Sequence, residues 1–180
     1  MKKDREQKNQ NLLEWYDSLI FALIVLVVVF TFVVRVVAVS GNSMVPTLHW
    51  GDRLLIQSTL YTPKKGDVVV LDGYTNLGKP LVKRIIACEG DTVELDTEKG
   101  LVYVNGQALE EPYTAEPTYE AGDNMTGQIT VPEGCVFVMG DNRNHSTDSR
   151  FSDVGFVDSR DILGRVLLRI FPMDQFGGIA

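Results

Sequence analysis

Hydrophobic residues are distributed very unevenly along this chain. An almost continuous apolar run covers Leu19–Val39 and is interrupted only by Thr31 and Arg35. A helix rises about 1.5 Å per residue, so such a run is long enough to cross the roughly 30 Å hydrocarbon core of a bilayer. The pattern therefore predicts one N-terminal transmembrane helix over residues 18–39.

Basic residues before this run predict its orientation. Four of them stand in the first eight positions, namely Lys2, Lys3, Arg5 and Lys8. The positive-inside rule makes residues 1–17 a cytoplasmic tail and residues 40–180 an extracytoplasmic domain. A cleaved signal peptide is the alternative, favoured by the small residues around Ala38, but its apolar region should be only about 7 to 15 residues long. The length of the run favours the anchor.

After the apolar run, the pattern changes to short segments rich in β-branched and apolar residues, separated by turn residues. These expected strands are Arg53–Ile56, Asp67–Leu71, Leu81–Ala87, Thr92–Leu95, Leu101–Val104, Gln128–Val131 and Val136–Met139. The pair Asn105-Gly106 predicts a two-residue hairpin. The polar stretch Glu110–Met125, with two prolines, predicts a long surface loop. The pattern predicts a mainly β domain of coiled or barrel-like antiparallel sheets. Within it, we assign residues 92–133 to a non-catalytic β excursion.

Charge and cysteine content exclude several classes of function. From residue 40 onward the chain has 20 acidic and 12 basic residues, which argues against binding to the phosphates of nucleic acid. Cys88 and Cys135 form no disulfide framework, and we expect free, buried thiols. The only histidines, His49 and His145, are far apart and lack a ligand pattern, so we expect no metal and no cofactor.

Ser43 and Lys83 are the candidates for chemistry. Ser43 follows the apolar run, which puts a serine hydroxyl at a membrane surface. This weak nucleophile needs a base, and a lysine serves if burial lowers its pKa. Lys83 and Arg84 lie on opposite faces of an expected strand, and only lysine readily gives up its proton. The alternative is a strand lysine whose amine simply reaches solvent.

A dense polar loop follows the strand Val136–Met139. Its small polar and charged groups are suited to position a lysine amine or a substrate backbone. A calcium loop is the alternative, but EF-hand spacing is absent and the loop contains two arginines. A Ser-His-Asp triad using His145 lacks support, because nothing around Ser43 resembles a Gly-x-Ser-x-Gly elbow.

Four motifs occur in a fixed order behind the apolar run. They are Gly41-Asn42-Ser43-Met44-Val45-Pro46-Thr47-Leu48, Gly51-Asp52-Arg53-Leu54-Leu55, Lys83-Arg84-Ile85-Ile86-Ala87-Cys88-Glu89-Gly90-Asp91 and Gly140-Asp141-Asn142-Arg143-Asn144-His145-Ser146-Thr147-Asp148-Ser149-Arg150. In these motifs, and over nearly its whole length, the chain resembles the bacterial type I signal peptidases of Gram-positive type. Those proteins are membrane-bound Ser/Lys endopeptidases that remove signal peptides from exported proteins.

The resemblance implies a role for each matching residue. Ser43 would be the nucleophile, Lys83 the general base and Ser146 the hydroxyl that orients the lysine. The supporting charges of the polar loop would be Asp141, Arg143, Asp148 and Arg150. The substrate would lie extended, with small residues at positions −3 and −1, in shallow apolar pockets. Our candidates for the pocket lining are Val39, Met44, Leu48 and Val82.

The resemblance also implies partners and a location. The partners would be signal peptides of exported pre-proteins and the lipid bilayer, beside the secretion translocon, without nucleic acid, metal or cofactor. The protein would be a single-pass protein of the bacterial cell membrane. The alternatives are a related Ser/Lys peptidase, such as a self-cleaving repressor, and a catalytically silent assembly factor. The first would carry a DNA-binding segment, and the second would be expected to lack the serine or the lysine.

Three positions depart from the family pattern or vary within it. Gly41 stands where some members have a serine that donates to the oxyanion. The backbone N–H of Ser43 must then do more of this work, with water or a neighbouring hydroxyl such as Ser40 as the second donor. Glu89 replaces a frequent proline at a turn, and His145 occupies a variable position that indicates a bystander. None of these changes the assignment of Ser43 and Lys83.

Overall fold

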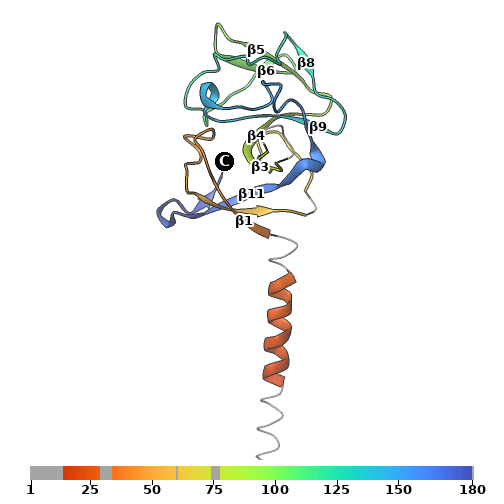
Figure 1. Cartoon of the computed structure of the whole chain (residues 1–180), viewed down its shortest axis with the longest axis vertical. Coiled ribbons are helices and arrows are strands. Elements are labelled where there is room, and N and C mark those ends of the chain that lie inside the picture. The colour runs from red at the N-terminus through yellow and green to blue at the C-terminus, as the bar shows by residue number, and fades with distance from the viewer. Residues whose placement is uncertain (1–13, 29–33, 60, 74–77, 180) are drawn as a thin grey trace, which may run out of the picture.

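The computed structural model describes residues 14–28, 34–59, 61–73 and 78–179 of the chain. Within these ranges it contains two antiparallel β-sheets and a helix over residues 14–28, which is drawn apart from the sheets in Figure 1. Strands dominate the described chain beyond residue 33, as the alternating apolar segments predict. The expectation of a mainly β fold is confirmed.

The larger sheet has the strand order β1-β2-β11-β3-β4-β9-β10, with β12 paired to β11. Its strands are β1 (Val34–Ala38), β2 (Arg53–Gln57), β3 (Val68–Leu71), β4 (Leu81–Cys88), β9 (Cys135–Met139), β10 (Val157–Asp158), β11 (Ile162–Phe171) and β12 (Gly177–Gly178). Register shifts interrupt β11 against both of its neighbours and β4 against β9. Such bulges increase the local twist, so the sheet coils.

The smaller sheet has the order β7-β6-β5-β8. Its strands are β5 (Thr92–Asp96), β6 (Leu101–Val104), β7 (Gln107–Ala108) and β8 (Ile129–Thr130). Between β6 and β7, Asn105 and Gly106 have φ angles of 53° and 75°, the left-handed conformations that a two-residue hairpin turn requires. This confirms the predicted hairpin. The long connection between β7 and β8 contains no helix or strand, as the polar sequence there predicts.

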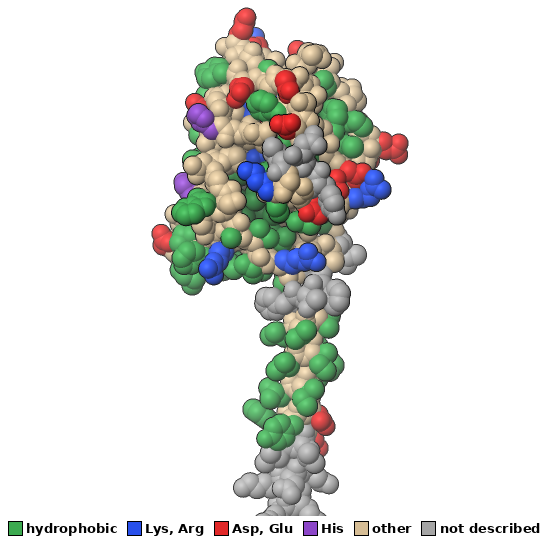
Figure 2. Space-filling model, in the orientation of Figure 1, with side chains coloured by type: hydrophobic (Ala, Val, Ile, Leu, Met, Phe, Trp, Pro, Cys, Tyr) green, Lys and Arg blue, Asp and Glu red, His purple; other side chains and the backbone are tan. Residues whose placement is uncertain are grey.

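The N-terminal region differs from the expectation of one helix over residues 18–39. Residues 14–28 are helical and exposed, and Figure 2 shows mostly hydrophobic side chains along them. Val34–Ala38 instead form β1, which pairs with β2 from Val34↔Gln57 to Ala38↔Arg53. β-branched residues suit a strand as well as a lipid-facing helix, and pairing with β2 decides between them here. No helix within the described ranges is long and apolar enough to cross a membrane, and the expected cytoplasmic tail lies mostly outside those ranges.

Four strands of the larger sheet were not predicted. They are β1, which was assigned to the helix, β11, the longest strand of the described residues, and the two-residue strands β10 and β12. β11 pairs with both β2 and β3 and thereby closes the centre of the sheet. Its sequence carries Arg165 and Arg169 among apolar residues, which obscures the alternation.

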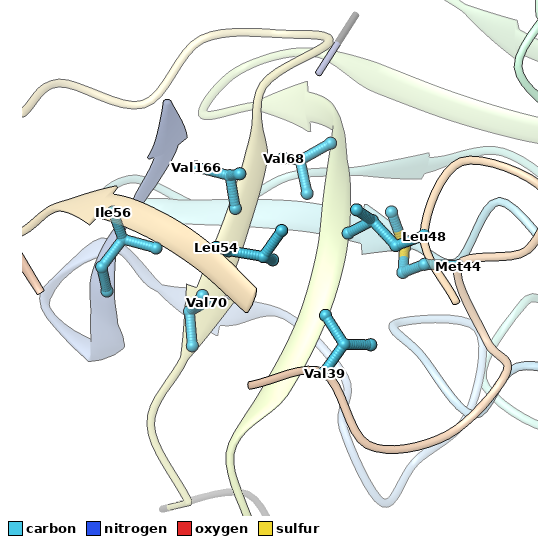
Figure 3. Packing of buried hydrophobic residues seen from close by; sticks show 8 residues of the cluster. All are labelled: Val39, Met44, Leu48, Leu54, Ile56, Val68, Val70 and Val166. Atoms are coloured by element: carbon cyan, nitrogen blue, oxygen red, sulfur yellow. The ribbon is translucent and has the colours of Figure 1, made fainter. Parts of the chain in front are cut away.

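A buried cluster fixes the segment between β1 and β2. Val39, Met44 and Leu48 come from this segment and pack against side chains of β2, β3 and β11 (Figure 3). The partners are Leu54, Ile56, Val68, Val70 and Val166. Each fully buried aliphatic side chain contributes about 1.5–3 kcal/mol by removal from water. We call residues 39–52 the nucleophile loop; its three anchors hold the candidate serine against the sheet.

Candidate active site

Ser43 and Lys83 lie at hydrogen-bond distance from each other. Lys83 Nζ is 2.7 Å from Ser43 Oγ. Ser43 is half-buried in the nucleophile loop, and Lys83 is only 2% exposed on β4. The fold thus joins the two candidates of the sequence analysis, which are 40 positions apart. The alternative of a lysine that reaches solvent is wrong.

The nucleophile loop is held from two sides around Ser43. On the core side, the adjacent Met44 is 2% exposed and packs in the cluster described above. On the other side, Asn142 N donates to Ser43 O at 3.0 Å, and Asn142 Nδ2 donates to Asn42 O at 3.0 Å. The serine backbone is therefore fixed before any substrate binds, as a preorganised nucleophile requires.

Burial sets the ionisation of Lys83. Removal from water lowers the pKa of its amine from 10.5 to about 8, because the charged form loses hydration. Asp148 and Asp141 favour the ammonium and raise the pKa, whereas Arg150 lowers it. With this pKa, about a tenth of the amine is neutral at pH 7. A neutral amine at this distance can accept the proton of the serine hydroxyl.

Asp148 and Arg150 form a buried ion pair beside Lys83. Both side chains are fully buried, and Arg150 donates to Asp148 from Nε at 2.8 Å and from Nη2 at 2.9 Å. Asp148 also accepts from Gly140 N at 2.9 Å, and Arg150 donates to Glu120 O at 2.8 Å. We call Gly140–Arg150 the polar loop; this pair joins its two ends.

Asp141 connects three parts of the site. Its carboxylate accepts from Arg84 Nε at 2.9 Å and from Arg84 Nη2 at 2.8 Å, and both side chains are buried. Thr47 Oγ1 donates to the same carboxylate at 2.5 Å. Asp141 therefore ties the polar loop to the nucleophile loop and to the strand that carries Lys83. Arg84 was considered only as a rival base, and its structural part in the site was not foreseen.

Arg143 is buried and paired with a residue that the sequence did not single out. Its guanidinium donates to both carboxylate oxygens of Glu111, at 2.8 and 2.6 Å. It also donates to Gly140 O at 2.9 Å and to Thr118 Oγ1 at 3.1 Å. Glu111 and Thr118 belong to the stretch between β7 and β8, whose composition resembles that of a solvated loop. Their role could not be found from sequence pattern alone.

Ser146 lies within the site without the expected contact. The residue is buried, and its Oγ has no hydrogen-bond partner among the described residues, so the expected bond to Lys83 is absent. The hydroxyl packs against Gly140, where a Cβ atom would overlap Ser146 and the carbonyl oxygen of Ser43. Glycine is thus the only residue type at position 140 that allows the polar loop to approach Ser43 this closely.

A cleft of about 440 Å³ opens beside Ser43 and Lys83. Its apolar lining includes Val39, Met44 and Val82, as expected from the sequence, together with Val37, Val70 and Leu81. Leu48 is fully buried in the core and does not line the cleft, which corrects the fourth expectation. His145 and Thr147 are exposed and line the cleft from the polar loop.

Two further expectations concern the cysteines and Gly41. Cys88 and Cys135 are free as expected, but both are only half-buried. Gly41 has a φ of 106°, which a residue with a side chain rarely adopts. Ser40 and Gly41 both line the cleft next to Ser43. In the described residues, no group of three or more His, Cys, Asp or Glu side chains is arranged to hold a metal ion.

Comparison with known proteins identifies the family. The family model described as "Signal peptidase, peptidase S26" matches residues 12–171. The chain belongs to this signal peptidase family. A signal peptidase I of Bacillus licheniformis is 37% identical over 177 residues, covering 93% of each chain. A probable signal peptidase I-1 of Synechocystis sp. is 39% identical over 170 residues, covering 88% of this chain and 82% of its own.

Further relatives have the same designation. Signal peptidase I P of Bacillus subtilis subsp. natto is 38% identical over 182 residues, covering 96% of each chain. A crystal structure of a signal peptidase I from Enterococcus faecalis is 32% identical, with a TM-score of 0.47, covering 59% of this chain and 98% of that chain. Membership in the S26 family makes this protein a serine endopeptidase, a hydrolase.

Proposed function

We propose that this endopeptidase cleaves signal peptides from exported pre-proteins, with Ser43 as nucleophile and Lys83 as general base. The observation that carries the proposal is the 2.7 Å distance between Lys83 Nζ and Ser43 Oγ, with the amine buried. Similarity to proteins named signal peptidase I supports the substrate class. The presence of both residues argues against a catalytically silent assembly factor, which would be expected to lack one of them.

The proposed mechanism is acyl transfer through an ester on Ser43. The neutral amine of Lys83 takes the proton of Ser43 as Oγ attacks the carbonyl carbon of the scissile bond. The backbone N–H of Ser43 donates to the resulting oxyanion. The Lys83 ammonium then gives its proton to the leaving amine, and the released mature chain departs. A water molecule, deprotonated by Lys83, hydrolyses the ester and restores both groups.

The cleft supports a preference for small residues at positions −3 and −1. Its apolar walls come from Val39, Met44 and Val82, joined by Val37, Val70 and Leu81. Because buried side chains hold the nucleophile loop in place, the walls of the cleft cannot move apart to accept a larger substrate side chain. Steric rejection of large residues is therefore the basis of specificity. The chemistry needs no metal or organic cofactor.

The segment before β1 is proposed to hold the protein in the bacterial cell membrane as a single-pass anchor. Its support is the apolar run Leu19–Val33 and the exposure of the helical residues 14–28. The basic N-terminal residues favour a cytoplasmic tail and an extracytoplasmic catalytic domain. Confinement to one surface raises the effective concentration of the enzyme near membrane-bound precursors that leave the secretion translocon.

The test is cleavage of a labelled precursor with an Ala-x-Ala site by the full chain in detergent or lipid vesicles. We expect cleavage after the second alanine by the unaltered protein and none by Ser43→Ala. Ser159→Ala, which makes the same change at a serine that does not line the cleft, is the matched control. Cleavage by Ser43→Ala at the normal rate, or an inert unaltered protein, would sink the proposal.

A further inference from the structure

The connection between β7 and β8 lies against the polar loop over much of its length. Asn144 Oδ1 accepts from Tyr119 N and Glu120 N, and Asn144 Nδ2 donates to Pro117 O. Asn124 N donates to Arg150 O at 2.9 Å. We call residues 109–128 the excursion. They include the expected surface loop Glu110–Met125 and lie within the region 92–133, which was expected to be non-catalytic. The contacts of the excursion with the polar loop are too numerous for that description.

Glu111 and Tyr113 of the excursion make further contacts, and these involve buried arginines. Glu111 receives both arms of the Arg143 guanidinium, whose side chain is fully buried. Tyr113 lies with its ring 3.9 Å from Arg84 Cζ and 5.9 Å from Arg143 Cζ, and its hydroxyl donates to Glu111 at 3.2 Å. Glu111 therefore contacts Arg143 of the polar loop. Tyr113 contacts Arg143 and also Arg84 of β4.

Arg143 and Arg84 are each connected to the surroundings of Ser43 and Lys83 through one intermediate residue, Gly140 for Arg143 and Asp141 for Arg84. Arg143 Nε donates to the carbonyl of Gly140, the residue that packs directly on Ser43 and Ser146. Arg84 stands next to Lys83 on β4 and is paired with Asp141, which Thr47 of the nucleophile loop also contacts. Displacement of either guanidinium would therefore move the polar loop relative to the serine and the amine.

We propose that Glu111 and Tyr113 are positioning residues for catalysis, which hold Arg143 and Arg84 and through them fix the polar loop against Ser43 and Lys83. The proposal rests on the proposed function of that pair. Neither residue reaches the reacting atoms. The excursion is then a brace for the active site, although the sequence pattern indicates only a connection between two short strands.

The positioning role of Glu111 and Tyr113 can be measured through the pKa of Lys83. The charged groups that act on its amine are Asp141, Asp148 and Arg150 from the polar loop, and Lys79 from the turn before β4. His145 lines the same cleft. If the polar loop loosens, water reaches the amine, and Asp148, Asp141 and Arg150 all move away from it. Loss of the two aspartates lowers the pKa of Lys83 and loss of Arg150 raises it, but removal from water is the largest cause of the shift. Rehydration therefore decides the direction, and the pKa of Lys83 rises from about 8 toward its ordinary value.

The experiment measures the pH dependence of kcat/KM for an Ala-x-Ala peptide with the full chain. Glu111→Gln removes the charge but keeps the shape, and we expect the rising limb of the profile to move up by about one pH unit, a loss of about tenfold at pH 7. Tyr113→Leu, which removes the ring from Arg84, should have the same effect. Tyr113→Phe keeps the ring and should restore most of the unaltered profile.

Two control variants separate positioning from general loss of stability. Glu110→Gln makes the same change at the adjacent, exposed residue. Asp123→Asn loosens the excursion elsewhere, where Asp123 accepts from Ser152 N and Ser152 Oγ at 2.7 Å. In both controls the rising limb of kcat/KM should lie at the same pH as in the unaltered enzyme, even if their melting temperatures are lower.

The result that overturns the inference is an unmoved limb in Glu111→Gln and Tyr113→Leu, or an equal shift in Asp123→Asn. The unaltered protein and Ser43→Ala are measured in the same series. If the unaltered protein is active and Ser43→Ala is inert, an unmoved rising limb refutes only the positioning role of Glu111 and Tyr113. If Ser43→Ala cleaves, the function proposed for the pair has failed instead.

Discussion

The amine nitrogen of Lys83 lies 2.7 Å from the hydroxyl oxygen of Ser43, although one residue belongs to β4 and the other to the nucleophile loop. Two independent packing arrangements create this contact. Buried anchors hold the nucleophile loop on the core, and the central position of β4 between β3 and β9 removes Lys83 from water. The contact therefore combines a fixed hydroxyl with an amine whose pKa is lowered by its burial.

The first prediction concerns the cost in folding free energy of burying the Lys83 amine. The folded pKa of Lys83, about 8, is below the value of 10.5 for the exposed amine. Between these values the unfolded chain binds more protons, so folding stability should rise with pH from 8 to 10.5, and below pH 8 the full cost is present. The cost is at most roughly 3 kcal/mol. Lys83→Met should therefore be inactive and more stable at pH 7, as measured by chemical denaturation.

The pH dependence of stability provides the control for this variant. The gain of Lys83→Met over the unaltered protein should shrink as the pH rises from 8 toward 10.5 and vanish above it, because the unaltered lysine is then neutral in both states. Lys79→Met changes an exposed lysine that also lines the cleft, and it should give no such gain. A Lys83→Met protein that is less stable at pH 7 would contradict the prediction.

The second prediction separates two serines of the polar loop. Among the residues that the structure describes, Ser146 Oγ has no hydrogen-bond partner, so Ser146→Ala should leave the free energy of unfolding unchanged or slightly raised. Ser149 Oγ accepts from Val138 N at 3.0 Å, so Ser149→Ala should cost about 1–3 kcal/mol. If Ser146 orients the amine during the reaction, only Ser146→Ala should lose cleavage, by tenfold or more. Normal cleavage by this variant would remove Ser146 from the mechanism.

The third prediction concerns the buried pair of Asp148 and Arg150. Asp148→Asn leaves the Arg150 cation buried without its counter-charge and should destabilise the protein by about 3–5 kcal/mol. Combining it with Arg150→Met removes the unpaired cation and should recover part of the loss. A double-mutant cycle by thermal or chemical denaturation measures the coupling. Additive effects of the two changes would show that the pair is not a unit.

The fourth prediction concerns Gly41 and the oxyanion. Some members of the family have a serine donor at this position, but here φ is 106°, so any side chain adds strain of about 1–3 kcal/mol. We expect Gly41→Ser to be less stable and no more active than the unaltered enzyme. Gly41→Ala carries the same strain without a hydroxyl and is the matched control. Faster cleavage by Gly41→Ser alone would show that the hydroxyl reaches the oxyanion despite the strain.

The sequence was sufficient to predict most of the strands near the site and the two side chains, Ser43 and Lys83, that the fold brings into contact. Seven short segments with β-branched residues correspond to β2, β3, β4, β5, β6, β8 and β9, each within about one residue at either end. Asn105-Gly106 predicted its turn because few residues adopt positive φ at two successive positions. Ser43 and Lys83 followed from the chemistry of serine and lysine and from the family motifs around them.

Other parts depended on contacts that local pattern does not encode. Val34–Ala38 continue an apolar run, and only pairing with β2 makes them a strand. Glu111 lies in a polar stretch, where nothing in the sequence distinguishes it from the exposed Glu110. Its partner Arg143 is 32 positions away, and the pairing arises from the fold. Leu48 was assigned to the cleft for its apolar side chain, but the core encloses it.

Titration of the Lys83 amine itself is the decisive measurement. An NMR titration of lysine side chains in the full protein, with Lys83→Met to assign the resonance, gives the pKa independently of turnover. We expect a midpoint near 8 that coincides with the rising limb of precursor cleavage, and a limb that His145→Ala leaves in place. A midpoint near 10.5, or a limb that depends on His145 and not on Lys83, would show that the lysine is not the base.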